Sequence, residues 1–394
     1  MKLKNIFLTS LMALSLVGCA DEKLGPTIFP DVNDDADPSS YTYKFDTWVN
    51  RNFRDVYNLE FKYRMEDVEA DMNYNLVPAT YDNARDLCLL THYLWFEAYG
   101  EYCGEDFLKT YGPRILHLIG SPAYNPTTGT EILGLAEGGL KVTLYKVNEM
   151  QLDNINQLNE YYFRTMHHEF GHILHQTKSY PTEFNLLSTG RYDSGTWQNK
   201  AIGYVASQGF VTPYASSENR EDFAETIANY LTRTDEQLEL ILWMADKGWA
   251  TGADDDKLNT DDAEYFAYYY LPDPTQPENR VYFLSSDEHD STYRVCLVAN
   301  ERGKSAANAK HLYTVEEVEA YLEQKKAEVG GEIYAVEDKD TVDGRAVILQ
   351  KQSIVRNWFK DTWNLDFDKL RDIVQRRQGD FDIEALRAQI DAID

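Results

Sequence analysis

The chain has 394 residues, enough for two or three domains or for one large domain with insertions. Hydrophobic residues make up 43% and charged residues 26%, a globular composition that excludes wholesale disorder, collagen and coiled coil. Lys and Arg total 38 against 66 Asp and Glu, which gives a net charge of −28, and no basic run offsets it, so we expect no nucleic acid partner.

The N-terminal segment, residues 1–18, is typical of a signal peptide. Two lysines precede the mostly apolar run Ile6–Val17, which is too short to span a bilayer. The run ends in Leu-Val-Gly-Cys, so Cys19 resembles the lipidated residue of a bacterial lipoprotein; the alternative is an ordinary secretory signal with a chance cysteine. We expect membrane attachment through this lipid anchor only, with residues 19–40, rich in Asp, Pro and Ser, as a flexible tether.

The first tether residues bear on the location of the protein. The acidic pair Asp21-Glu22 resembles the surface-export signal of lipoproteins in the Bacteroides group. We therefore expect an outer-membrane lipoprotein at the cell surface, with the periplasmic face as the alternative. The tether would carry a soluble body.

The first half of that body is predicted to be α+β. Hydrophobic periodicity and turn residues predict five elements in chain order: a short helix Phe45–Phe53, a strand Asn58–Arg64, a helical stretch 81–111 that Gly100 and Gly104 interrupt, and the strands Ile115–Ile119 and Leu140–Tyr145. A long helix from about Asn156 to Gln176 then ends by Pro181. Residues 182–217 are loop-like, and a second helix covers about Asn219–Arg233.

The remaining third changes character. Residues 246–344 are predicted to be an acidic, loop-rich insertion or accessory segment. Within it, Asp254–Asp262 lacks the ligand spacing of a calcium loop and is interpreted as a solvated acidic loop, and 314–328 as a charged helix. Residues 345–394 are predicted to be helical and to pack back on the core through Trp358, Phe359 and Trp363.

The predicted long helix carries His168-Glu169-Phe170-Gly171-His172, an HExxH motif. Residues four apart lie one turn apart on the same helix face, so His168 and His172 can bind one Zn²⁺. Glu169 lies about 100° around the helix, where it can take a proton from a zinc-bound water and pass it to a leaving amine. The alternative is a histidine cluster on a structural helix. For His167 and His175 we expect packing or support of the ligands.

A catalytic zinc site needs a third protein ligand. The metzincin pattern is excluded because His175 and Lys178 occupy the positions of its glycine and third histidine. An acidic residue on the second helix remains, and we assign Glu221 to the zinc. Glu225, one turn on, is expected to accept a hydrogen bond from a ligating histidine, and Ala224 leaves room for close helix approach. The alternatives for the third ligand are Glu218, Asp222 and Glu225.

The stretch Tyr214–Glu225 resembles the catalytic segment of gluzincin peptidases of the anthrax lethal factor type. In that type a tyrosine seven residues before the glutamate ligand helps to stabilise the tetrahedral oxyanion. The resemblance implies this role for Tyr214, which as a phenol can donate to developing negative charge. The alternative is a loop tyrosine without a catalytic role.

More broadly, the chain resembles the zinc-binding metallopeptidase lipoproteins of Bacteroidetes, which accompany outer-membrane nutrient-import systems. The matching stretches are Trp48–Tyr63, Ala136–Lys141, Thr165–Gln176, Glu221–Glu225 and Gln350–Arg377. The fold expected is an α+β zincin-like (gluzincin) core over residues 41–245, with a small mixed sheet, an active-site helix, a Glu-bearing helix and added C-terminal helices.

These observations predict a lipid-anchored zinc metallopeptidase with one Zn²⁺ per chain, acting on a peptide or protein substrate through a zinc-activated water. A strand such as Leu140–Val147 would align an extended peptide by edge pairing. An outer-membrane import complex is a further candidate partner. Two alternatives stay open: a zinc amidase acting on cell-wall or glycan-linked amides, and a non-catalytic import-accessory binding lipoprotein. An intact Glu169 argues against the second.

Overall fold

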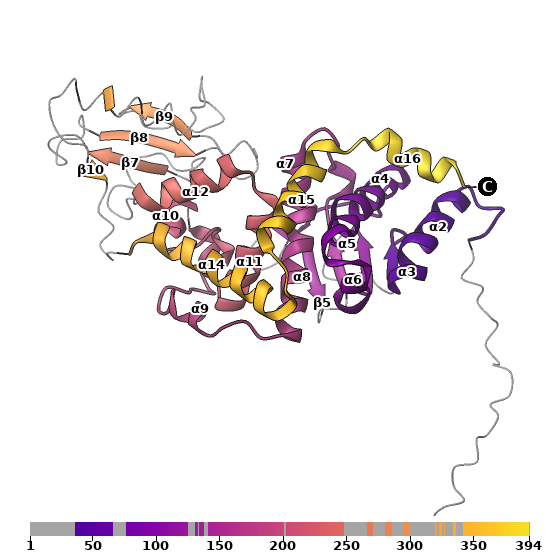
Figure 1. Ribbon diagram of the computed structural model, residues 1–394. Helices are drawn as coiled ribbons and strands as arrows, with labels where there is room; N and C mark the ends of the chain where they lie inside the picture. Colours follow the sequence, from indigo (N-terminus) through magenta and orange to yellow (C-terminus); the bar gives the residue numbers. More distant parts are fainter. Residues whose placement is uncertain are drawn as a thin grey trace, which may run out of the picture. The chain divides into compact units, whose positions relative to one another are not determined.

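The computed structural model divides the chain into two units, Met1–Tyr43 and Lys44–Asp394, and the elements below belong to the second apart from one residue (Figure 1). The residues described are 36–65, 76–124, 131–132, 134–137, 141–200, 202–247, 266–270, 280–285, 295–299, 320, 323–324, 327, 334–335 and 342–393. The predicted signal peptide, Cys19 and the acidic loop Asp254–Asp262 lie outside them.

The first helix is longer than the hydrophobic pattern predicts, whereas the helical stretch predicted at 81–111 keeps its outer bounds. The helices are α2 (Tyr43–Val49), which continues through a π-helical turn (Asn50–Arg54) into α3 (Asp55–Tyr57), and α4 (Tyr81–Thr91), which continues through a second π-helical turn (His92–Phe96) into α5 (Glu97–Cys103), followed by α6 (Glu105–Tyr111). The expected break at Gly100 is wrong, because this glycine lies inside α5 next to the buried Tyr99. The break comes at Gly104, whose φ of +81° ends the helix.

A four-stranded sheet lies beside these helices. Its strands are β1 (Glu60–Lys62), β2 (Ile115–Leu118), β6 (Lys141–Leu144) and β5 (Gly134–Glu137), in that spatial order. The first three are parallel and β5 runs antiparallel to β6, so the expected mixed sheet is present. Because β6 has a neighbour on each side, the expectation that Leu140–Val147 offers a free edge is wrong. A two-stranded ribbon joins β3 (Ala123–Tyr124) to β4 (Glu131–Ile132).

The predicted long helix is present as one helical run. It comprises α7 (Ile155–Leu158), a π-helical turn (Asn159–Phe163) and α8 (Arg164–Thr177). The second predicted helix is α11 (Asn219–Thr232). Between them, the loop-like prediction is wrong for α9 (Glu183–Leu186) and α10 (Ile202–Ser207), which are too short to give a helical period in the sequence.

Beyond α11, the sequence missed helix α12 (Asp235–Lys247). The expected loop-rich character of the insertion is also wrong where four strands form an antiparallel sheet in the order β10-β7-β8-β9. These strands are β7 (Phe266–Tyr270), β8 (Arg280–Ser285), β9 (Val295–Ala299) and β10 (Tyr334–Ala335). The predicted helix 314–328 falls mostly outside the described residues.

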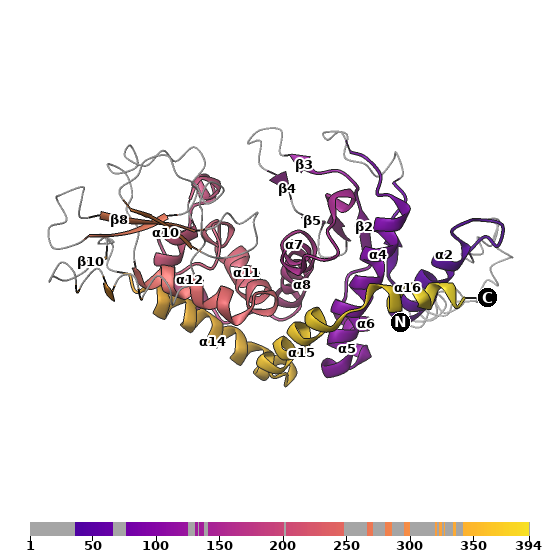
Figure 2. The ribbon, with the colours of Figure 1, turned by 90° about the horizontal axis from the view of Figure 1, so that it is seen from above.

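Three C-terminal helices pack back on the earlier ones, as the sequence predicts. They are α14 (Gly344–Trp363), α15 (Phe367–Asp380) and α16 (Ile383–Asp391). Helices α14 and α15 contact α11, α15 also contacts α5, and α16 contacts α4 (Figure 2). Trp358 and Phe359 are buried in the core they share with α8 and α11.

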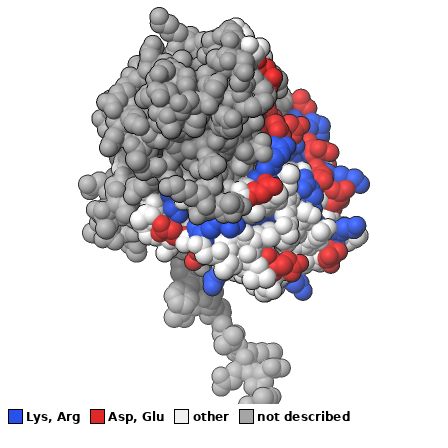
Figure 3. Space-filling view, turned by 90° about the vertical axis from the view of Figure 1, so that its left-hand side faces the viewer, with Lys and Arg blue, Asp and Glu red and all other residues white. Residues whose placement is uncertain are grey.

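Two further features concern the charge of the surface and the character of the helices. On the described part of the face in Figure 3, acidic and basic side chains are interspersed. Within the described ranges, none of the helices has the length and apolar character needed to cross a bilayer.

Candidate metal centre

Helix α8 buries one face and turns the other toward α11. Met166, Phe170 and Leu174 recur at helical spacing and are buried in the core. The Phe170 ring makes edge contacts with Trp95 and Tyr99, which lie on the π-helical turn after α4 and on α5. This packing fixes the rotation of α8 about its own axis, so the motif histidines emerge on the side that faces α11.

Helices α8 and α11 approach each other closely beside the motif. A Cβ added at Gly171 would lie 3.4 Å from the Cα of Ala224, so a side chain at Gly171 would crowd the contact and the expected close approach at Ala224 is confirmed. Phe223, on the neighbouring position of α11, is buried and stacks on Tyr180 with ring centroids 4.1 Å apart. With Phe223 anchored in the core, Glu221 and Glu225 face α8.

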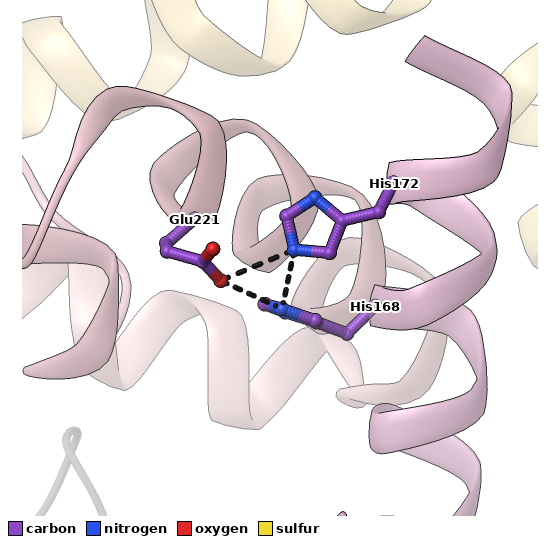
Figure 4. A group of neighbouring side chains, drawn as sticks. All are labelled: His168, His172 and Glu221. Carbon is purple, nitrogen blue, oxygen red and sulfur yellow. Dashed lines mark hydrogen bonds and ion pairs between the residues drawn. The ribbon is translucent and has the colours of Figure 1, made fainter. Parts of the chain in front are cut away.

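The side chains of His168, His172 and Glu221 converge on one point (Figure 4). The Nε2 atoms of the two histidines are 3.0 Å apart, and Glu221 Oε2 lies 3.0 Å from that of His168 and 3.1 Å from that of His172. Tetrahedral ligands at about 2.0–2.2 Å from zinc are about 3.3–3.6 Å from one another, so an opening of a few tenths of an ångström would admit the ion. Two imidazoles and a carboxylate are also donors that zinc prefers.

The far sides of both imidazoles are held by other residues. His168 Nδ1 donates to Glu225 Oε1 at 2.8 Å, and Glu225 in turn accepts a hydrogen bond from Thr212 Oγ1. His172 Nδ1 lies 2.8 Å from His175 Nε2. When Nδ1 of each ring carries the proton and donates, each Nε2 is left as a lone pair that points at the shared centre. The structure thus shows the contact expected of Glu225 and gives His175 a supporting contact.

The charges at this centre suit a cation. Burial alone would lower the pKa of His168, but its hydrogen bonds to Glu221 and Glu225 raise it to about 10. Burial raises the pKa of Glu221, but its hydrogen bonds to both histidines lower that pKa well below its usual range. The carboxyl group therefore stays ionised. These carboxylates favour a positive charge at the centre, and a divalent cation there would displace a proton from His168.

Glu169 is buried at 9% exposure beside the two histidines. Burial raises its pKa, and the charges of His168 and His172 partly oppose that rise. A carboxylate with a raised pKa is a better proton acceptor than one with the ordinary value, which is what a general base requires.

The ring of Tyr214 lies beside the same centre. Its ring centroid is 5.7 Å from that of His168 and 4.8 Å from that of Trp197. Burial, the charge of Glu221 and a hydrogen bond to that carboxylate raise the pKa of its hydroxyl, so the O–H stays protonated and can act as a donor. Thr212 Oγ1 accepts from Ala215 N and holds the turn that carries Tyr214.

Other sequence-predicted candidates fall elsewhere. His167 turns into the core, where its Nδ1 lies 3.1 Å from the Tyr99 hydroxyl and burial lowers its pKa to about 3, so the packing role expected of it fits. Asp222 is paired with Lys351 at 2.6 Å. Among the described residues, His168, His172 and Glu221 form the group of metal-ligating type that converges.

The sequence analysis did not identify two residues that contact acidic side chains of α11, Thr212 and Lys351. Thr212 carries no motif, and nothing in its surroundings signals its bond to Glu225. Lys351 does leave a signal, since it occupies the same helical face as the apolar Ile348 and Val355, where a lysine is out of place.

Comparisons with known proteins point to one family. Residues 39–282, which include both helices of the centre, match the family described as "Putative zinc-binding metallo-peptidase". A crystal structure described as that of a putative zinc-binding metallo-peptidase from Bacteroides caccae is 31% identical, with a TM-score of 0.55 over 91% of this chain and 98% of that one. No curated protein matches the chain significantly.

Proposed function

The chain belongs to the "Putative zinc-binding metallo-peptidase" family, and from that premise we propose that it is a gluzincin-type peptidase with a zincin-like core that hydrolyses peptide bonds. The convergence of His168, His172 and Glu221 is the observation that carries this proposal.

We further propose one Zn²⁺ per chain, lipid anchoring through Cys19 in the outer membrane at the cell surface, and association with an import complex. Partitioning of the protein into a detergent phase tests the anchor, and Cys19→Ser should abolish that partitioning.

The donor set assigns the roles. His168, His172 and Glu221 would hold the ion, which when bound polarises a carbonyl and acidifies water. Glu169 accepts the proton of the attacking water and delivers it to the amine nitrogen as the peptide bond breaks. The Tyr214 hydroxyl donates a hydrogen bond to the substrate carbonyl oxygen as negative charge develops there. Glu225 and His175 keep the two imidazoles in the orientation and tautomer that ligation requires.

A free sheet edge suits an extended peptide. Among the described strands, β5 pairs with β6 on one side and ends the sheet on the other. Its outer backbone groups can therefore pair with a substrate strand, a common mode of peptide recognition. In this proposal β5, and not the strand within Leu140–Val147, pairs with the substrate peptide.

The first test is hydrolysis before and after metal removal. We expect the zinc-loaded protein to cleave members of a peptide library, the chelated protein to lose that activity, and one equivalent of zinc to restore it. Mass spectrometry of the products identifies the broken bonds, with muropeptides and amidated glycans as parallel substrates. Cleavage confined to those amides would replace the peptidase by an amidase, and bound zinc without hydrolysis would favour a binding protein.

Tyr214→Phe tests the oxyanion role. The change removes one hydroxyl and keeps the ring beside His168 and Trp197. We expect kcat to fall by about 10²–10³, the usual loss for one oxyanion donor, with zinc affinity unchanged. Trp197→Phe is the matched control, since it alters the neighbouring ring and leaves the hydroxyl in place. A Tyr214→Phe protein with wild-type kcat would remove the tyrosine from the mechanism.

A further inference from the structure

One lysine of the C-terminal helix α14 lies buried close to the candidate metal centre. Lys351 is 1% exposed. Its Nζ lies 2.6 Å from Asp222 Oδ2, donates to the carbonyl oxygen of Gly209 at 2.7 Å, and sits 4.1 Å from the ring centroid of Phe210. Because a buried ammonium is costly unless it is paired and hydrogen-bonded, these contacts fix its position closely.

The two polar contacts of Lys351 reach α11, which bears Glu221, and the segment that leads to Tyr214. Asp222 follows Glu221 directly in the first turn of α11, and the Tyr192 hydroxyl also donates to Asp222 Oδ2 at 2.8 Å. Gly209 precedes the turn that carries Thr212 and Tyr214. One ammonium group therefore contacts both segments. Through Asp222 it is linked to the neighbouring Glu221, and through Gly209 it is linked to the segment that carries Tyr214.

Helix α14 lies directly against the same segment. Gly209 has a φ of +91°, and a Cβ there would come within 2.4 Å of Val347 Cγ1 on α14. A Cβ at Gly344, the first residue of α14, would come within 2.4 Å of the carbonyl oxygen of Ala206. These two close approaches fix α14 against residues 206–209 without any contribution from the lysine. The helix backbone that carries Lys351 is therefore held in place.

We propose that Lys351 is a positioning residue for the metal centre. Through Asp222 it fixes the first turn of α11, and hence Glu221, against the two imidazoles; through Gly209 it fixes the segment that ends at Tyr214. The inference rests on the proposed function, because it takes the three converging side chains as zinc ligands. A merely structural lysine would change stability alone, whereas a positioning lysine also changes zinc affinity and ligand geometry.

Lys351→Met is the variant that tests this role, and Arg371→Met is its matched control. Arg371, on α15, is another buried cation that ties a C-terminal helix to α11. It does so at the far end of that helix, through the carbonyl oxygens of Tyr230 and Arg233, both at 2.8 Å. Each variant removes one charged link between a C-terminal helix and α11, but only Lys351 reaches the end of α11 that bears Glu221.

Zinc affinity is measured by competition with a chelator of known affinity, at a temperature below the unfolding transition of each variant. We expect Lys351→Met to raise the zinc Kd by about 10–100-fold and to shift the visible spectrum of the Co²⁺-loaded protein. Arg371→Met should lower the melting temperature and leave the Kd within about twofold of wild type.

The double variant Lys351→Met/Asp222→Asn covers the case in which Lys351→Met does not fold, since it leaves no charge buried without a partner. It should fold and still bind zinc about 10-fold or more weakly. Wild-type affinity in this variant, or equal weakening in Arg371→Met, would overturn the inference while the zinc site stands. A wild-type protein that binds no zinc would overturn the proposed function and this inference with it.

Discussion

Glu169→Gln is expected to lower kcat for peptide hydrolysis by about 10²–10⁴ and to leave zinc binding unchanged. Glutamine keeps the size of the side chain but cannot accept and return a proton. The carboxylate it replaces is buried beside both histidines and has a raised pKa, the condition that favours proton transfer near neutral pH. Since Glu169 is not among the converging donors, zinc content should stay at one ion per chain.

The control for this variant is Glu183→Gln, which removes the same charge from an exposed position on α9. It should have wild-type kcat. Steady-state kinetics on the best library peptide, together with metal analysis of each preparation, make the comparison. A Glu169→Gln enzyme with wild-type turnover would contradict the general-base assignment, and one that loses its zinc would show that Glu169 serves the metal instead.

Glu221→Ala is expected to weaken zinc binding by about 100-fold or more, because the loss of a ligand exceeds the 10–100-fold typical of an outer partner. It should abolish hydrolysis at limiting zinc. Removal of the carboxylate also takes away a partner of both imidazoles, so His172 then keeps its contacts with His175 and His168 but no carboxylate partner among those described above.

Glu236→Ala controls for charge and position. Glu236 is an exposed carboxylate in the first turn of α12, as Glu221 is in the first turn of α11, so both changes remove a carboxylate from the same place relative to a helix dipole. Zinc titration of the two metal-free proteins should separate them clearly. Equal affinities would mean that a residue other than Glu221 completes the site.

The common face of the two histidines could be predicted because it depends on a local rule. The spacing of His168 and His172 fixes their common face once a helix forms, and the helix is long and strongly periodic. The periodicity of α11 predicted a second helix. The acidic residues in and around its first turn gave Glu221 as the predicted third ligand, with three other acidic residues as alternatives. Glu221 is singled out by its approach to both histidines, which depends on how α8 and α11 pack.

What the sequence missed depends on contacts between distant segments. Strand β6 shows an alternating pattern whether or not it has two neighbours, so its interior place in the sheet was not visible. Helix α10 is six residues long and has too few turns for a period to emerge. The links from Thr212 to Glu225 and from Lys351 to Asp222 join residues whose proximity is set only when α11, α14 and the segment before Tyr214 meet.

The claim that zinc is bound by two imidazoles and a distant carboxylate is tested most directly by anomalous scattering at the zinc absorption edge from crystals of the zinc-loaded protein. The account predicts one peak per chain, about 2.0–2.2 Å from His168 Nε2, His172 Nε2 and a Glu221 carboxylate oxygen. A peak elsewhere, or a metal-replete crystal in which no acidic group accompanies the two histidines, would contradict it.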